Sequence, residues 1–264
     1  MICRKTVAIL KRLLPNSVFN LLVVVRRLSR RPHADSALFV DRLRGRTGLE
    51  IGGPSSLFRL ELPLYAVVND LDGVNFSNKT LWEGALRSGQ TFNFRPGSFG
   101  RQFIADATDL SEIPAQHYDF LLSSNCLEHI ANPLRALAEW RRVLKSGGVL
   151  VLAVPRKEGN FDHRRPVTTF RHILNDFKGN TSEHDLTHLD EILALHDLSL
   201  DPEAGSSEEF RVRSFKNPEN RALHHHVFDL ELIKEVVVFS GFDLVHGVST
   251  SRDHAILATK PGSV

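Results

Sequence analysis

The chain has 264 residues, of which 42% are hydrophobic and 24% charged, proportions that are ordinary for a soluble globular protein. They exclude wholesale disorder, a collagen-like repeat and a polytopic membrane protein. The net charge of +2 conceals an asymmetry, because residues 1–47 carry +9 and residues 48–264 carry −7. Two cysteines, Cys3 and Cys126, are too few for a disulfide framework and indicate a reducing, cytoplasmic compartment.

Residues 1–46 are predicted to form a basic amphipathic helical arm. One helix is expected over 5–14 and a second over 17–28, and the apolar run 18–25 is too short to span a bilayer. Two interpretations stay open. Residues 1–31 either contact the inner face of a membrane as a peripheral anchor, or they pack as helices on the following domain.

From residue 48 onward, near-continuous apolar runs predict strands that are buried on both faces. These runs cover 48–51, 65–68, 103–106, 118–124 and 149–155. A helix separates the last two runs, with Asn132 as its N-cap, Pro133 in its first turn and Gly147 at its exit. Strands that alternate with helices indicate a parallel sheet.

The end of the chain has a different pattern. Asp229 is expected to cap a helix that runs to Phe239, and strands over 242–248 and 254–259 follow. Their connection is short, so the two strands should be antiparallel. Residues 156–228, here called the insertion, interrupt the alternation and hold eight of the thirteen histidines. We expect the insertion to lie over the carboxyl edge of the sheet, where such sheets bind ligands.

Acidic residues and glycines follow the first three predicted strands. Glu50 precedes the pair Gly52 and Gly53, whose backbone can approach a ligand closely. Asp72 comes about twenty residues later and could accept the hydroxyls of a ribose, with Asp70 as the alternative. With the acid at the end of the run 103–106, three carboxylates lie at predicted strand ends. They suit a ligand that carries an amine, a ribose and a base better than a ligand that carries a pyrophosphate.

Four motifs carry a family resemblance: Ile104–Leu110, Tyr118–Phe120, Leu127–Ile130 and Leu137–Gly148. In this order and spacing the chain resembles class I S-adenosylmethionine-dependent methyltransferases, over about residues 48–155 and the terminal hairpin. It departs from that family at Pro54 and Ser56, where the family has glycines, and at Ser146, where it has proline.

The resemblance implies an α/β fold with a Rossmann-like, doubly wound, seven-stranded sheet. That sheet would be mostly parallel, with an antiparallel C-terminal hairpin and an inserted cap, in a methyltransferase domain over 47–264 with 156–228 as its acceptor-binding insertion. It also implies S-adenosyl-L-methionine as the cofactor. The implied cofactor residues are Glu50 for the methionine amine, Gly52 and Gly53 at the turn, Asp72 for the ribose, Asp106 and Ala107 for the adenine, and Ser124 and Asn125 along the methionine.

Three histidines are candidate bases for the acceptor's proton, because imidazole titrates in the useful range. They are His129 after the fourth strand, and His163 and His188 in the insertion. Arg164 or Arg165 could bind an anionic part of the acceptor. Each could instead be an ordinary loop residue. No metal site is predicted, because Asp185, His188 and the histidine run 224–226 match no standard metal motif.

The sequence therefore predicts a methyltransferase that acts on a small or carrier-linked acceptor, with a saccharide favoured by the polar insertion. A non-catalytic S-adenosylmethionine-binding or scaffold protein is one alternative. A nicotinamide-dependent sugar-modifying enzyme is another, but Tyr65 and Tyr118 lack the lysine four residues later that such enzymes use. Nucleic acid is not an expected partner, because the body is acidic. The oligomeric state stays open.

Overall fold

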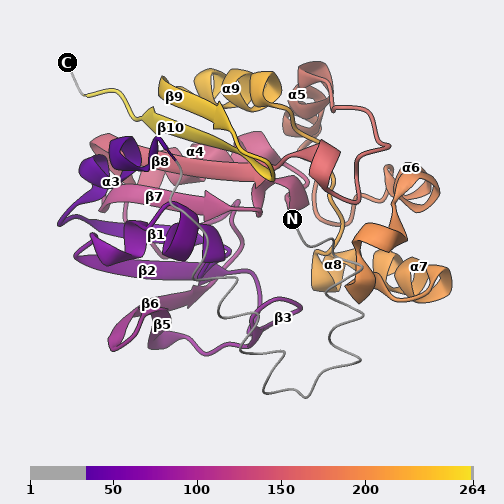
Figure 1. Ribbon diagram of the computed structural model, residues 1–264, viewed down its shortest axis with the longest axis horizontal. Coiled ribbons are helices and arrows are strands. Elements are labelled where there is room, and N and C mark those ends of the chain that lie inside the picture. The colour runs from indigo at the N-terminus through magenta and orange to yellow at the C-terminus, as the bar shows by residue number, and fades with distance from the viewer. Residues whose placement is uncertain (1–33, 263–264) are drawn as a thin grey trace.

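The computed structural model describes residues 34–262, which form an eight-stranded sheet with helices on both faces (Figure 1). The predicted helices over 5–14 and 17–28 lie outside the described residues. The order of the strands is β5-β6-β2-β1-β7-β8-β10-β9. Their bounds are β1 (Thr47–Ile51), β2 (Asp70–Asn75), β5 (Gly89–Arg95), β6 (Ser98–Ile104), β7 (Tyr118–Ser124), β8 (Leu144–Pro155), β9 (Asp243–Ser249) and β10 (Asp253–Thr259).

The predicted mixed sheet is confirmed. β6, β2, β1, β7 and β8 pair in parallel, whereas β10 lies antiparallel between β8 and β9. The sheet has one strand more than the expected seven, because β5 adds antiparallel to the outer side of β6. A small separate hairpin, β3 (Lys79–Thr80) and β4 (Gly84–Ala85), follows β2.

One face of the sheet is covered by α4 (Pro133–Val143), α5 (Phe170–Gly179) and α9 (Leu230–Phe239). α4 and α9 begin at the predicted caps, where Asn132 accepts from Arg135 N at 3.1 Å and Asp229 from Leu232 N at 2.8 Å. Trp140 of α4 is fully buried in this core, and its Nε1 donates to the Ala107 carbonyl at 3.0 Å.

The other face is covered by α3 (Ser36–Leu43) and by two short helical turns, Leu57–Glu61 and Leu64–Ala66. Phe39 and Phe58 are fully buried in this second core. The apolar run 65–68, which was expected to be a strand, belongs to this layer instead. Tyr65 and Val68 are buried there, and burial alone does not distinguish a strand from a buried turn.

This difference moves the second strand along the chain. β2 begins at Asp70 and ends at Asn75, so Asp72 lies inside the strand, opposite Leu49 of β1. The Asp72 carboxylate accepts from Tyr118 Oη at 2.7 Å and from Arg101 N at 2.6 Å. The expectation that Asp72 follows the strand end is therefore wrong.

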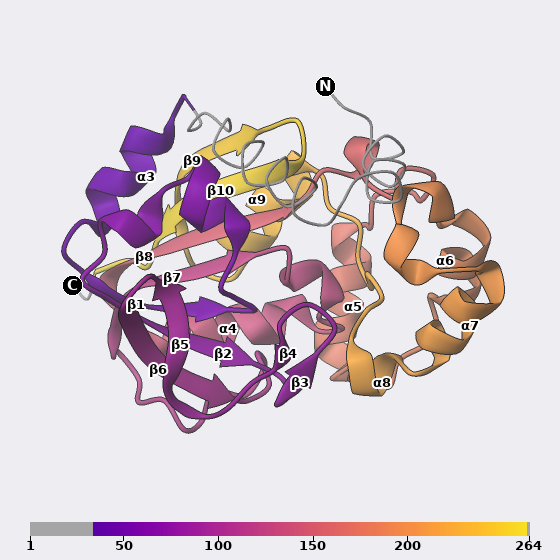
Figure 2. The same ribbon diagram turned by 60° about the horizontal axis from the view of Figure 1, so that its bottom comes forward.

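Apart from α5, which packs on the sheet, the insertion lies beyond the carboxyl ends of the parallel strands in both views (Figures 1 and 2). It includes α5 and three further helices: α6 (Leu189–Leu195), α7 (Ser207–Phe215) and α8 (Asn217–Asn220). It has its own apolar cluster, made of Leu189, Ile192, Ala204, Phe210 and Leu223. Across residues 34–262, none of the helices has the length and apolarity needed to cross a bilayer.

Candidate functional site

A cavity of about 780 Å³ opens at the carboxyl ends of β1, β2, β6 and β7, where open α/β sheets bind their ligands. Its size is within the range of small-molecule sites. The wall formed by the sheet edge includes Gly52, Asn75, Ala107, Ser124 and Asn125. The facing wall comes from the insertion and includes Asn160, Phe161, Asp201, Arg213, Arg221 and His224.

The turn after β1 requires its two glycines for different reasons. Gly52 lines the cavity with φ at +77°, and a Cβ there would lie 2.9 Å from Cys126 Sγ. A Cβ on Gly53 would lie 2.2 Å from the carboxyl carbon of Glu50. The first glycine therefore lets backbone reach the cavity, and the second lets the turn pack on a buried carboxylate.

Glu50 lies behind this turn and is fully buried. Its carboxylate accepts from Tyr65 Oη at 2.5 Å and from Ser55 N at 3.1 Å. Burial raises the pKa of Glu50 to about 7, against the lowering effect of these hydrogen bonds. In this arrangement Glu50 holds the turn in place, and its expected contact with the cofactor's amine stays a prediction.

Asn75 occupies the strand-end position that was predicted for Asp72. It is the last residue of β2, it lines the cavity, and its Nδ2 donates to the Gly53 carbonyl at 3.0 Å. The sequence holds one signal for Asn75, because the pair Gly73-Val74 directly precedes its polar side chain. This pattern is typical of a buried strand that ends at the edge where ligands bind.

Asp106 lies just after β6, as predicted, but it is already engaged. Its Oδ1 accepts from Thr108 N at 2.8 Å, and its Oδ2 accepts from Arg221 at 2.5 Å. Burial alone would raise the pKa of Asp106, but the Arg221 guanidinium and Thr108 outweigh it and lower that pKa. Arg221 also lies 4.9 Å from the centre of the Phe76 ring. This arginine of the insertion was not predicted from the sequence.

The structure brings one of the three candidate histidines to the cavity. His129 lines it, and its ring centre lies 5.0 Å from that of Trp82, which lies between β3 and β4. His163 lies outside the cavity and contacts Asp197 at 3.0 Å. His188 also lies outside it. The catalytic role of each histidine stays a prediction.

The two candidate arginines differ in exposure. The Arg164 side chain is 51% exposed and pairs with Asp197 at 3.1 Å. Arg165 is 1% exposed and pairs with Asp162 at 3.2 Å and with Glu191 at 2.8 Å. Arg165 therefore ties parts of the insertion together instead of presenting a charge to an acceptor.

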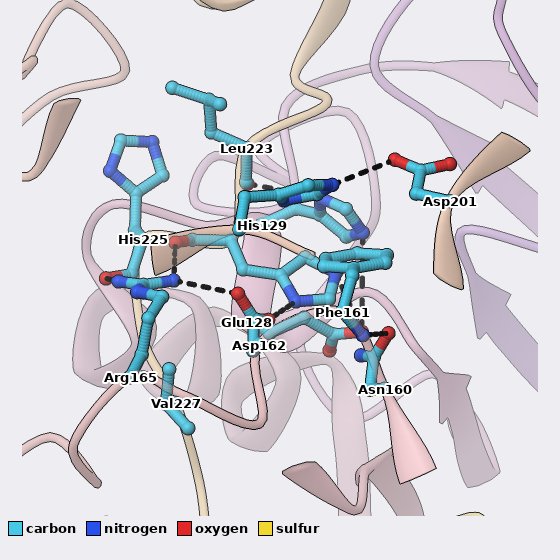
Figure 3. A network of polar contacts seen from close by, with 12 residues as sticks. Glu128, His129, Asn160, Phe161, Asp162, Arg165, Asp201, Leu223, His225 and Val227 are labelled. Carbon is cyan, nitrogen blue, oxygen red and sulfur yellow. Dashed lines mark hydrogen bonds and ion pairs between the residues drawn. The ribbon is translucent and has the colours of Figure 1, made fainter. Parts of the chain in front are cut away.

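Around His129 lies a network of buried polar groups, drawn in Figure 3. Glu128 is 1% exposed, and its Oε1 lies 4.0 Å from Nε2 of both His129 and His224. The Nδ1 of His129 contacts the Leu223 carbonyl at 3.1 Å, and the Nδ1 of His224 contacts the Asp162 carboxylate. Burial raises the pKa of Glu128 well above its usual range and lowers that of His129 well below.

A second group of histidines lies in the insertion away from the cavity. His188 and His172 face each other with their Nε2 atoms 3.0 Å apart, and His226 completes the group. Asp176 Oδ2 lies 3.2 Å from His172 Nε2. Asp185, three residues before His188, accepts a hydrogen bond from Thr187 Oγ1 at 2.8 Å.

The sheet-forming part of the chain is similar to a known protein family. Residues 49–152 match the family described as a methyltransferase domain. The match covers β1 to β8 and ends before the insertion. No curated protein matches the chain in sequence. Residues 49–152 are therefore similar to methyltransferase domains, and the match supports S-adenosylmethionine as the cofactor.

Several solved structures are similar to this chain. An S-adenosylmethionine-dependent methyltransferase from Mesorhizobium loti has a TM-score of 0.50 at 13% identity, over 85% of this chain and 95% of its own. One from Methanosarcina mazei has a TM-score of 0.45 at 18% identity, over 86% and 98%. A complex of the Haloferax volcanii Trm112 methyltransferase activator with a methyltransferase gives 0.46 at 12% identity, over 86% and 87%. At these identities the likeness shows the fold alone.

Proposed function

We propose that the protein is an S-adenosylmethionine-dependent methyltransferase whose acceptor is a hydroxyl-rich small or carrier-linked molecule, with a saccharide as the favoured class. One observation carries this proposal. A single cavity joins the edge of the methyltransferase domain, where the cofactor is expected, to a polar wall supplied by the insertion. Both substrates of a transfer reaction could therefore lie in the same enclosed space.

The sheet edge of the cavity fits the cofactor. The Gly52 backbone, Asn75 and Ala107 would hold its amino-acid, ribose and adenine parts, and Ser124 and Asn125 would line the methionine chain. An asparagine at the ribose position offers both a donor and an acceptor to hydroxyl groups. The bound cofactor supplies a methyl group on a sulfonium. The chain's own contribution is to hold the acceptor in line with that group.

The acceptor wall presents charged pairs that suit hydroxyl groups. Asp201 and Arg213 lie 3.1 Å apart there, and Glu61 pairs with Arg252 at the same cavity. Carboxylates accept hydrogen bonds from hydroxyls and guanidinium groups donate to their oxygens, so both sides of a polyol can be satisfied. Exposed Trp82 adds an apolar surface for the carbon face of a ring.

Calorimetry with S-adenosylmethionine and S-adenosylhomocysteine tests the cofactor half of the proposal. Both should bind with a stoichiometry of one. Labelled cofactor is then incubated with cell extract separated into sugar, lipid and protein fractions, and label should appear in the sugar or glycoconjugate fraction. Absence of cofactor binding would refute the proposal. Binding without transfer to any fraction would favour the scaffold alternative.

A further inference from the structure

The side chains of Glu128, His129 and His224 bring three electron-pair donors together with nothing positive between them. Glu128 is 1% exposed, and neither carboxyl oxygen has a hydrogen-bond partner among the described residues. A buried carboxyl group without partners is costly, whether it is charged or protonated. The Nε2 atoms of His129 and His224 each lie 4.0 Å from its Oε1.

The proton of each imidazole can be assigned from its other contact. The Leu223 carbonyl can only accept, so His129 Nδ1, 3.1 Å away, must carry the proton. His224 Nδ1 faces the Asp162 carboxylate and carries a proton for the same reason. In the neutral rings, both Nε2 atoms therefore present lone pairs toward Glu128, and neither imidazole can donate to the carboxylate or to the other ring.

We propose that Glu128, His129 and His224 form a binding site for a zinc ion. Two histidines and one glutamate are an established ligand set for catalytic zinc. Zinc lies about 2.0–2.2 Å from nitrogen and oxygen ligands, so tetrahedral ligand atoms are about 3.4 Å apart. The three ligand atoms lie within 4.8 Å of one another, so they need to move closer together to enclose the ion; the two 4.0 Å separations from Glu128 need to shorten by about half an ångström.

The surroundings of the site match those of metal-binding histidines. Such histidines donate their second ring nitrogen to a carboxylate or a backbone carbonyl, which fixes the ring. The second nitrogen of His224 contacts the Asp162 carboxylate, and that of His129 contacts the Leu223 carbonyl. Asp162 is held in turn by buried Arg165, so the carboxylate that orients His224 cannot swing away. The insertion thus completes a site that the methyltransferase domain begins at Glu128 and His129.

All three ligands line the cavity, so the fourth position of the ion would face the acceptor. Under the proposed function, the zinc ion binds an acceptor hydroxyl and lowers its pKa. The hydroxyl proton passes to water, the oxygen forms a bond to the methyl carbon, and the carbon–sulfur bond breaks with its electron pair remaining on sulfur. His129 is then a metal ligand and not a base.

Metal binding by the tag-free, EDTA-treated full-length chain tests the site without any acceptor. Zinc is added in a calorimeter, and cobalt(II) is added as a visible-light probe of a nitrogen and oxygen ligand set. We expect one zinc per chain and cobalt d–d bands. Glu128→Gln should weaken zinc at least a hundredfold, and Asp162→Asn should weaken it about 10–100-fold.

The second histidine group supplies the matched control. His172→Gln removes a member of that group and should leave zinc binding and the cobalt bands unchanged. Binding that is lost in His172→Gln but retained in Glu128→Gln would overturn the proposal, as would a chain that binds no zinc. Circular dichroism checks that each variant is folded. The proposed function is tested separately, because the EDTA-treated chain should still bind S-adenosylmethionine.

Discussion

Glu50 should make the stability of the protein depend on pH in a defined window. In the folded chain its pKa is about 7, compared with 4.5 for an unperturbed glutamate. Between these values the folded state holds a proton that the unfolded state has released, so stability is lost as the pH rises from 4.5 through 7. A shift of about 2.5 pKa units corresponds to about 3 kcal/mol.

The substitution Glu50→Gln removes the titrating group and keeps its size. The free energy of unfolding is measured by urea denaturation of both chains at intervals from pH 4.5 to pH 7.5. From the lowest to the highest pH, the wild type should lose about 3 kcal/mol relative to Glu50→Gln. Taking the difference between the two chains cancels the other titrating groups.

Glu112→Gln provides the control, because Glu112 is exposed and its substitution removes a carboxyl group without changing a buried site. Its difference from the wild type should stay nearly constant over the same pH range. A constant difference for Glu50→Gln as well would refute the reasoning, because it would mean that the buried carboxyl titrates as it does in the unfolded chain.

Three further substitutions test other parts of the structure. Gly52→Ala should weaken S-adenosylmethionine binding at least tenfold by calorimetry, whereas Gly97→Ala, at the same φ of +77° but with open space around it, should not. Asn132→Ala should lower the free energy of unfolding by about 1 kcal/mol in urea, because α4 loses its cap; an unchanged value would contradict that role. Arg165→Met should cost about 3–5 kcal/mol by removing the guanidinium that pairs with buried Asp162, whereas Arg164→Met, at an exposed pair, should cost much less; equal costs would contradict this comparison.

The elements that the sequence predicted well are those determined by local pattern. Asn132 and Asp229 cap helices in the structure as expected, because a cap and its first turn are neighbours in the chain. The strand predicted over 118–124 has the bounds of β7, since its side chains are almost all buried. The terminal hairpin followed from the shortness of its connection.

The elements that the sequence could not predict depend on contacts between distant residues. The apolar run 65–68 has the pattern of a strand, and only its packing under α3 shows otherwise. This error placed Asp72 at the strand end, a position that Asn75 occupies in the structure. Arg221 reaches Asp106 across 115 positions, and the main chain at Leu223 fixes His129 across 94 positions. No local sequence pattern indicates such pairings, so the contacts on the acceptor side of the cavity could be identified only from the structure.

The separate apolar cluster of the insertion has a consequence for how the acceptor wall can change. Phe210 and Leu223 pack with α6 inside the insertion, not with either core of the sheet. Polar residues on its cavity face, such as Arg213, can therefore be varied without disturbing the layers that hold the strands. In directed evolution, a library confined to this wall should keep most of its members folded, which makes the insertion a natural place to alter acceptor choice.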